Sequence, residues 1–239
     1  MSALVSQYDA FIGHVIRCLF EDLPDLLDSS NHNIQLKELL AFDDIEDAKN
    51  SILEKEVETV LRSSHNDQIE WIERKLSCEI RTHIPKWNEF IEITERRNLF
   101  VHNNGAVNKT YVQNMKKGTN GFEYETSIGE RLNVSTSYFR IAVDVLSELG
   151  VKTYQIAWRK TKILEMKDLN RHLHHMTFEM LQNKKFEISK TLLDFALSPG
   201  ILKTCDESPI FLNNVNYAIA LRDTGHREGA IETMKKIDW

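Results

Sequence analysis

The stretch that decides the fold is Glu92-Ile93-Thr94-Glu95-Arg96-Arg97-Asn98-Leu99-Phe100-Val101-His102-Asn103-Asn104-Gly105. Apolar residues recur through it at helical spacing, and Pro85 precedes it at a position where a missing N–H costs least. Asn103, Asn104 and Gly105 form a stop signal, because Asn and Gly tolerate the left-handed conformation that ends helices. The stretch therefore predicts a helix from about Pro85 to Asn103.

This apolar helix also carries a concentration of polar side chains. At about 100° per residue, Glu95, Asn98 and His102 line one stripe. Arg97 lies about 140° from His102 on a regular helix, so the two share a site only under a further condition. Either the Arg97 side chain wraps round the helix, or the helix loosens before Asn103, or a second subunit brings another copy of the segment. A histidine at this place suits a general acid or base.

The spacing Arg97-Asn98-x3-His102 resembles the signature of the HEPN superfamily, in which an arginine precedes a histidine by a short spacer. The likeness covers about residues 2–160 and is specific only around the motif. Many HEPN proteins are metal-independent ribonucleases that act as dimers, with the motif at the subunit interface. The resemblance implies an endoribonuclease in which Arg97, Asn98 and His102 are catalytic. It also implies a homodimer, no metal and no cofactor, RNA products with 2′,3′-cyclic phosphate and 5′-hydroxyl ends, and a role as a toxin or in antiphage defence.

Further residues are candidates for supporting roles. HEPN enzymes often place an extra polar residue from a neighbouring helix beside the motif, and His65 or Glu73 would fill that place. Glu95 lies on the motif stripe, and Arg96 and Lys109 are candidate RNA-binding residues. The alternatives are a helix cap for His65, a surface charge for Glu73 and solvated charges for the basic residues.

Composition narrows the class of protein. The chain has 239 residues, of which 41% are hydrophobic and 28% charged, with only nine Gly and four Pro, and this mix favours an all-α fold. The net charge of −6 argues against a broad surface that coats nucleic acid, so RNA binding would need a local basic site, and DNA binding is not expected. Three scattered cysteines without a CxxC pair favour a reducing compartment. No apolar run suits a membrane span or a signal peptide, which predicts a cytoplasmic protein.

The pattern changes after a long helix that is expected to end near residue 162, so we divide the chain into a HEPN-like helical domain, 1–162, and a helical-repeat domain, 163–239. Two helix pairs are expected in the second domain. The segment from Asn216 to Ile231 resembles a tetratricopeptide repeat, with Ala218 and Ala230 at the small positions. The first pair fits less well, and the turns lie farther apart than the usual period of about 34 residues. Either Trp239 caps the stack or the repeats continue in a longer protein.

Two further features leave alternatives open. His172 and His175 share a helix face and are candidate metal ligands. A surface or packing role is the favoured interpretation, so no metal site is predicted. The glycine-containing stretch 118–134 lacks helical period and is expected to be a loop or small hairpin, with the hypothesis that it folds over the catalytic cleft. For the whole chain, the alternative to a nuclease is a non-catalytic adaptor that dimerises and docks partner proteins. In either case residues 163–239 would bind a partner or an antitoxin.

Overall fold

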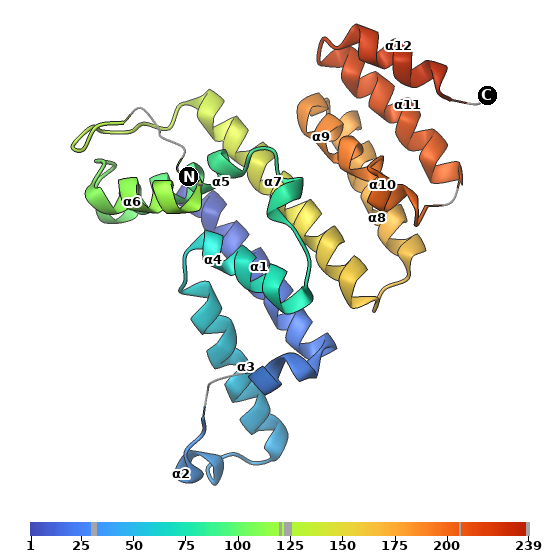
Figure 1. The fold of residues 1–239 in the computed structure, drawn as a ribbon. Helices are drawn as coiled ribbons and strands as arrows, with labels where there is room; N and C mark the ends of the chain where they lie inside the picture. The colour runs from blue at the N-terminus through green and yellow to red at the C-terminus, as the bar shows by residue number, and fades with distance from the viewer. Residues whose placement is uncertain (30–32, 120, 122–125, 206, 238–239) are drawn as a thin grey trace. The chain divides into compact units, whose positions relative to one another are not determined.

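The computed structural model describes residues 1–29, 33–119, 121, 126–205 and 207–237. Within these residues the secondary structure consists of α-helices and two short 3-10 helices, and no β-strand is formed. The predicted all-α class is therefore confirmed. The chain divides into two compact units, residues 1–146 and 147–239, which are described separately below (Figure 1).

The first unit is a helical bundle in which α1 packs against α3 and α5, and α5 also packs against α4 and α6 (Figure 1). Its elements are α1 (Ser2–Asp22), η1 (Pro24–Ser29), α2 (Leu36–Leu39), α3 (Ile45–Leu61), α4 (His65–Leu76), η2 (Arg81–His83), α5 (Trp87–His102), α6 (Lys109–Gly118) and the first part of α7 (Thr136–Thr161).

The central helix α1 supplies much of the core of the first unit. Five apolar residues of α1 recur at helical spacing; Tyr8, Val15 and Leu19 are buried, whereas Leu4 and Phe11 are only half-buried. The buried face is wider than one stripe, because α1 contacts helices on more than one side. Its additional buried side chains are Val5, Ile12, Ile16 and Phe20.

The motif helix α5 ends where the sequence predicts. Asn104 and Gly105 both have positive φ, and the backbone N–H groups of Asn103 and Gly105 donate to the Leu99 carbonyl at 2.8 and 3.0 Å. The chain beyond the helix is held by residues 127–132, since Leu132 donates its N–H to the Gly105 carbonyl at 3.0 Å. This pairing includes one isolated β-bridge between Ala106 and Arg131. The middle of the expected loop, 120 and 122–125, lies outside the described residues, and the hypothesis that the loop folds over the catalytic cleft stays a prediction.

The second unit consists of the remainder of α7 and two helical hairpins with a short helix between them. Its elements are α8 (Met166–Gln182), α9 (Phe186–Ala196), α10 (Pro199–Leu202), α11 (Glu207–Asp223) and α12 (Arg227–Lys235). Gly225 has a φ of +88° in the turn between α11 and α12, and Ala218 and Ala230 are buried in one cluster with Leu221. The resemblance to a tetratricopeptide repeat stays a prediction.

The division between the two units falls inside α7, whereas the sequence boundary at 162/163 falls just after this helix ends. The two divisions rest on different criteria, because the first groups residues by packing and the second by the change of pattern along the chain. The prediction that Trp239 caps the repeat stack concerns a residue outside the described part of the chain.

Candidate functional site

Three helices of the first unit bring an aspartate, a histidine and an arginine together. Nε2 of His65, at the start of α4, lies 2.7 Å from Oδ1 of Asp9 on α1. The other carboxylate oxygen of Asp9 accepts a hydrogen bond at 3.4 Å from Nη2 of Arg97 on α5. Asp9 therefore links the imidazole and the guanidinium, and we call these three residues the Asp9 cluster.

The sequence around His65 explains why its side chain is fixed. Ser64 caps α4, because its side chain accepts the N–H of Asp67 at 3.2 Å. The Gln68 side chain donates to the carbonyls of Leu61 and Ser63, both at 3.2 Å, and so ties the end of α3 to the start of α4. The alternative role of His65 as a helix cap is wrong, because the cap is Ser64 and His65 itself is buried in the Asp9 cluster.

Aromatic rings form the inner wall of the Asp9 cluster. The ring of Phe90 lies 6.1 Å from that of His65 and 5.4 Å from that of Tyr8, both in edge-on geometry. Burial raises the pKa of the Tyr8 hydroxyl, and the neighbouring Asp9 carboxylate raises it further. The Tyr8 hydroxyl is buried and lacks a hydrogen-bond partner among the described residues, which holds it in the neutral form beside the cluster.

Glu95 lies within electrostatic reach of the same cluster. Its carboxylate accepts a hydrogen bond at 2.9 Å from Asn114 on α6. Burial raises the pKa of the Glu95 carboxyl, and this effect is opposed by the hydrogen bond from Asn114, by the charge of His65 and by a hydrogen bond from Asn98. Of the predicted supporting residues, Glu95 and His65 are thus brought together near Arg97.

Arg97 is the part of the cluster that reaches solvent. Its side chain is 23% exposed, and Nη1 donates to the Asn98 side chain at 3.1 Å. Its buried Nε has no hydrogen-bond partner in the described part of the chain. An arginine has five N–H donors, so the two bonds to Asp9 and Asn98 hold the guanidinium in place while leaving part of its donor capacity unused.

His102 stands apart from the Asp9 cluster. It is the last residue of α5 and its side chain is exposed. The helix does not loosen before Asn103, and the Arg97 side chain is directed to Asp9 and Asn98 rather than round the helix. Of the three conditions under which Arg97 and His102 would share a site, only the arrival of a second copy of the segment is left.

Arg96 belongs to a different cluster, on the other side of α5. Its Nε donates to Glu92 at 2.6 Å, its Nη1 donates to the Asn133 carbonyl at 2.7 Å, and its guanidinium stacks on the Tyr138 ring at 4.2 Å. Glu92 is buried and also accepts hydrogen bonds from the hydroxyls of Tyr111, at 3.1 Å, and Tyr138, at 2.6 Å. The predicted RNA-binding arginine therefore joins α5 to α6 and to the start of α7.

The two other candidates also lie elsewhere. Glu73 lies in the last turn of α4. Its carboxylate accepts hydrogen bonds from the backbone N–H groups of Ile80 and Arg81, at 2.7 and 2.8 Å, and from the Arg81 side chain at 2.7 Å. It is neither beside the motif nor a plain surface charge, because it closes the turn before η2. Lys109 is exposed in the first turn of α6.

Sequence reasoning missed Asp9 and Glu92. A lone aspartate on an amphipathic helix has no local signal, and its partners lie 56 and 88 positions away. Glu92 did have a signal, since a Glu four residues before an Arg on a helix predicts an ion pair. The sequence did not indicate that this ion pair packs between two tyrosines, Tyr111 and Tyr138.

The histidines of α8 take mainly packing roles. His172 Nδ1 lies 3.2 Å from the Gln155 amide nitrogen, and its ring centre lies 5.0 Å from that of Tyr154. Burial lowers the pKa of His172, and the neighbouring His175 lowers it further. His174 bonds to the Asn213 side chain at 2.8 Å. Among the described residues, no group of three or more His, Cys, Asp or Glu side chains is arranged to hold a metal ion.

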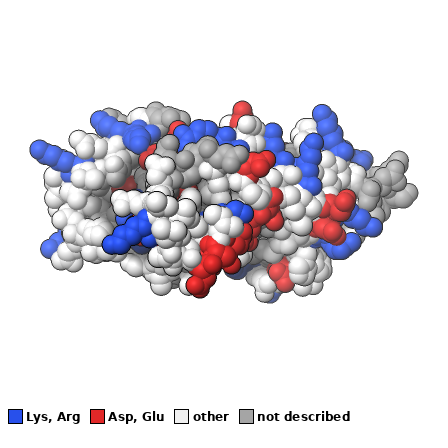
Figure 2. Space-filling view, turned by 90° about the horizontal axis from the view of Figure 1, so that it is seen from below, with Lys and Arg blue, Asp and Glu red and all other residues white. Residues whose placement is uncertain are grey.

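The surface charges are mixed. Figure 2 shows both acidic and basic side chains on the visible face. None of the helices in the described ranges combines the length and apolar character needed to cross a bilayer.

Comparison with models of protein families, with curated proteins and with solved structures gave no match.

Proposed function

We propose that this protein is a metal-independent endoribonuclease of the HEPN type, in which Arg97, Asn98 and His102 act in a site completed by a second copy of the chain. The observation that carries the proposal is the state of Arg97, a part-exposed guanidinium fixed by Asp9 and Asn98 with donors to spare. A fixed arginine fork is suited to a phosphodiester, since it matches two phosphate oxygens at once.

The proposed RNA cleavage requires few chemical groups. The ribose 2′-oxygen attacks the adjacent phosphorus and loses its proton, and the 5′-oxygen leaves and gains one, which yields a 2′,3′-cyclic phosphate and a 5′-hydroxyl. An exposed imidazole such as His102 can take or give these protons. Arg97 would stabilise the charge on the phosphorane, and Asn98 would orient either the phosphate or Arg97.

The geometry of α5 supports the proposal of a dimer. Arg97 and His102 lie on different sides of a helix that is regular to its end, so one chain does not present both to one phosphate. A two-fold axis beside the exposed end of α5 would place His102 of one copy near Arg97 of the other, and the reverse. His65 and Glu95 would then support the site from within each copy, by holding Asp9 and Asn98.

The substrate is RNA, and the setting that the motif suggests is antiphage defence or a toxin–antitoxin pair in the cytoplasm. The second unit would bind a protein partner or an antitoxin. A non-catalytic adaptor remains the second candidate, and one observation favours it: the pairing of Arg97 and His65 with Asp9 also satisfies both groups as structural residues. Cleavage activity separates the two.

The test is RNA cleavage by the purified chain in EDTA, with analysis of the product ends. We expect cyclic-phosphate ends from the wild type and a loss of about a hundredfold or more in His102→Ala and in Arg97→Gln. His175→Ala and Arg62→Gln are matched controls, because both residues are exposed and their ion pairs with Glu179 and Glu58 lie along their own helices. Thermal melting checks that each variant is folded.

Equal loss in the control variants would contradict the assignment of the site. An absence of cleavage of tRNA, mRNA and rRNA by a folded wild-type dimer would overturn the nuclease and favour the adaptor. Cleavage that persists in both His102→Ala and Arg97→Gln would also overturn it.

A further inference from the structure

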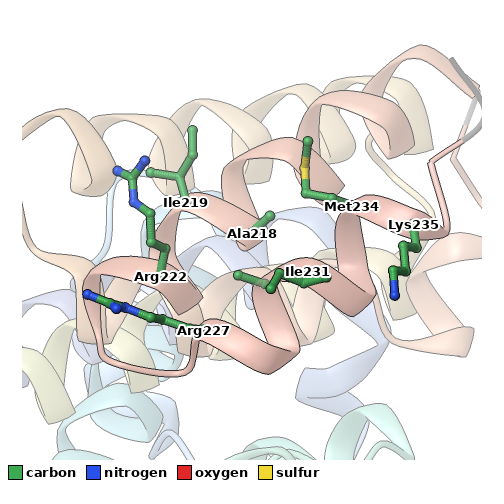
Figure 3. Close-up of a pocket in the computed structure, with 8 residues that line it drawn as sticks. Ala218, Ile219, Arg222, Arg227, Ile231, Met234 and Lys235 are labelled. Atoms are coloured by element: carbon green, nitrogen blue, oxygen red, sulfur yellow. The ribbon is translucent and has the colours of Figure 1, made fainter.

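An apolar groove of about 740 Å³ runs along α11 and α12 in the second unit (Figure 3). Figure 3 shows Arg222 and Arg227 at one end of it and Lys235 at the other, with apolar side chains between them. We call it the α11–α12 groove, and it is lined by Ala218, Ile219, Arg222, Arg227, Ala230, Ile231, Met234 and Lys235.

The α11–α12 groove is apolar in the middle and basic at its ends. Ile231 is 57% exposed, which is unusual for a large aliphatic side chain. No carboxylate is among the described residues that line the groove. Arg222 is paired with Asp223 at 2.9 Å, so the net positive charge at the rim rests on Arg227 and Lys235. The occupant should therefore be apolar with acidic flanks.

A second exposed apolar surface has the complementary character. Figure 1 shows α2 at the lower tip of the first unit. Leu36 and Leu40 are 69% and 76% exposed, and Ile45, which follows the turn after α2, is 64% exposed. Leu36, Leu39 and Leu40 make a short helical stripe at i, i+3 and i+4. We call residues 36–47 the α2 tip.

Acidic residues surround the apolar side chains of the α2 tip. Only one basic residue, Lys37, lies within residues 36–47. The acidic residues of the segment are all exposed, and they are Glu38, Asp43, Asp44, Glu46 and Asp47. Asp44 caps α3 and Glu46 pairs with Lys49, so Glu38, Asp43 and Asp47 are the carboxylates most open to a partner.

We propose that the α2 tip of one copy of this chain docks into the α11–α12 groove of a second copy. The leucines of the tip would cover Ile231 and Met234, while Glu38 and Asp43 would face Arg227 and Lys235. Exposed apolar clusters rimmed by polar residues mark interaction sites, and one contact accounts for both of these. The volume of the groove is within the range of pockets that take a few bulky side chains.

The contact is head-to-tail, because the tip and the groove are different surfaces on different units. A pair of copies joined by one such contact still has one free tip and one free groove, so association continues into rings or longer assemblies as concentration rises. The proposed contact does not involve the exposed end of α5. A test of this association therefore does not depend on whether the protein cleaves RNA.

The test is sedimentation velocity of the full chain over a range of concentrations, with paired charge reversals. The tip variant carries Glu38→Lys and Asp43→Lys, and the groove variant carries Arg227→Glu and Lys235→Glu. We expect each variant alone to associate about tenfold or more weakly than the wild type, since like charges then meet across the contact. An equimolar mixture of the two variants should regain association, because the altered tip fits the altered groove and the native tip fits the native groove.

Recovery in the mixture is an outcome that misfolding does not produce, since it requires both variants to be folded. A charge swap of the exposed Glu58–Arg62 pair on α3 is the matched control and should leave association unchanged. Wild-type behaviour in either variant, or a mixture that associates no better than its components, would overturn the proposal. So would a wild type whose size does not change with concentration.

Discussion

Replacing Glu92 by glutamine should loosen α5 and its neighbours without changing the shape of the core. The carboxylate is buried and accepts hydrogen bonds from Arg96, Tyr111 and Tyr138. Glutamine is nearly isosteric, so the substitution removes the negative charge rather than creating a cavity. The mostly buried guanidinium of Arg96 is then left without a carboxylate partner.

The magnitude can be worked out from these contacts. Removing one partner of a buried ion pair costs about 3–5 kcal/mol, because the other charge is left uncompensated. Arg96 keeps its bond to the Asn133 carbonyl and its stacking on Tyr138, which points to the low end of that range. We therefore expect a loss of about 3 kcal/mol in the free energy of opening of α5.

Native-state hydrogen exchange measures this loss directly. Since about 1.4 kcal/mol corresponds to a factor of ten, the protected amides of α5 should exchange about a hundredfold faster in Glu92→Gln. Amides of α9 in the second unit serve as an internal reference and should keep their rates. Glu89→Gln is the matched control, because Glu89 is exposed on the same helix. Acceleration of less than about threefold, or equal acceleration in the control, would refute the reasoning.

Three further substitutions test other parts of the structure. Burial raises the pKa of Glu95, so the folded state binds the Glu95 proton more tightly than the unfolded state does, and ionisation of Glu95 lowers the stability of the fold as pH rises. Glu95→Gln should therefore gain stability relative to the wild type between pH 4 and pH 8. Urea titrations at the two pH values measure this gain. Burial lowers the pKa of His172, so this residue opposes folding once the pH falls below its ordinary value near 6.5, and His172→Gln should reduce the acid sensitivity of α8 in hydrogen exchange. A Cβ on Gly118 would lie 2.8 Å from Ile91, so Gly118→Ala should destabilise the chain by about 1–3 kcal/mol in thermal melting, whereas Gly200→Ala, with open space around it, should not.

Local rules predicted much of the helical framework. Asp44 accepts the N–H groups of Glu46 and Asp47, as an acidic residue at the start of a helix should. The Ser135 side chain likewise accepts the N–H of Tyr138 at the start of α7. These signals were readable because capping depends on residues within three or four positions of one another. The Asp9 cluster was not readable in this way, because it depends on which helices become neighbours.

Two adjacent arginines on α5 have different surroundings, although they are neighbours in the sequence. Arg96 lies four positions after Glu92, on the face that packs toward α6 and α7, and its guanidinium is paired with the buried Glu92 carboxylate and bonded to the Asn133 carbonyl. Arg97 is rotated from it by about 100°, meets Asp9 of α1 and remains part-exposed. The Arg-Arg pair alone gives no sign of which arginine is paired with a buried carboxylate. Removal of Arg96 should therefore lower stability together with any activity, whereas removal of Arg97 should lower activity in a chain that still folds. A cleavage assay becomes informative about the site only when the two are changed separately.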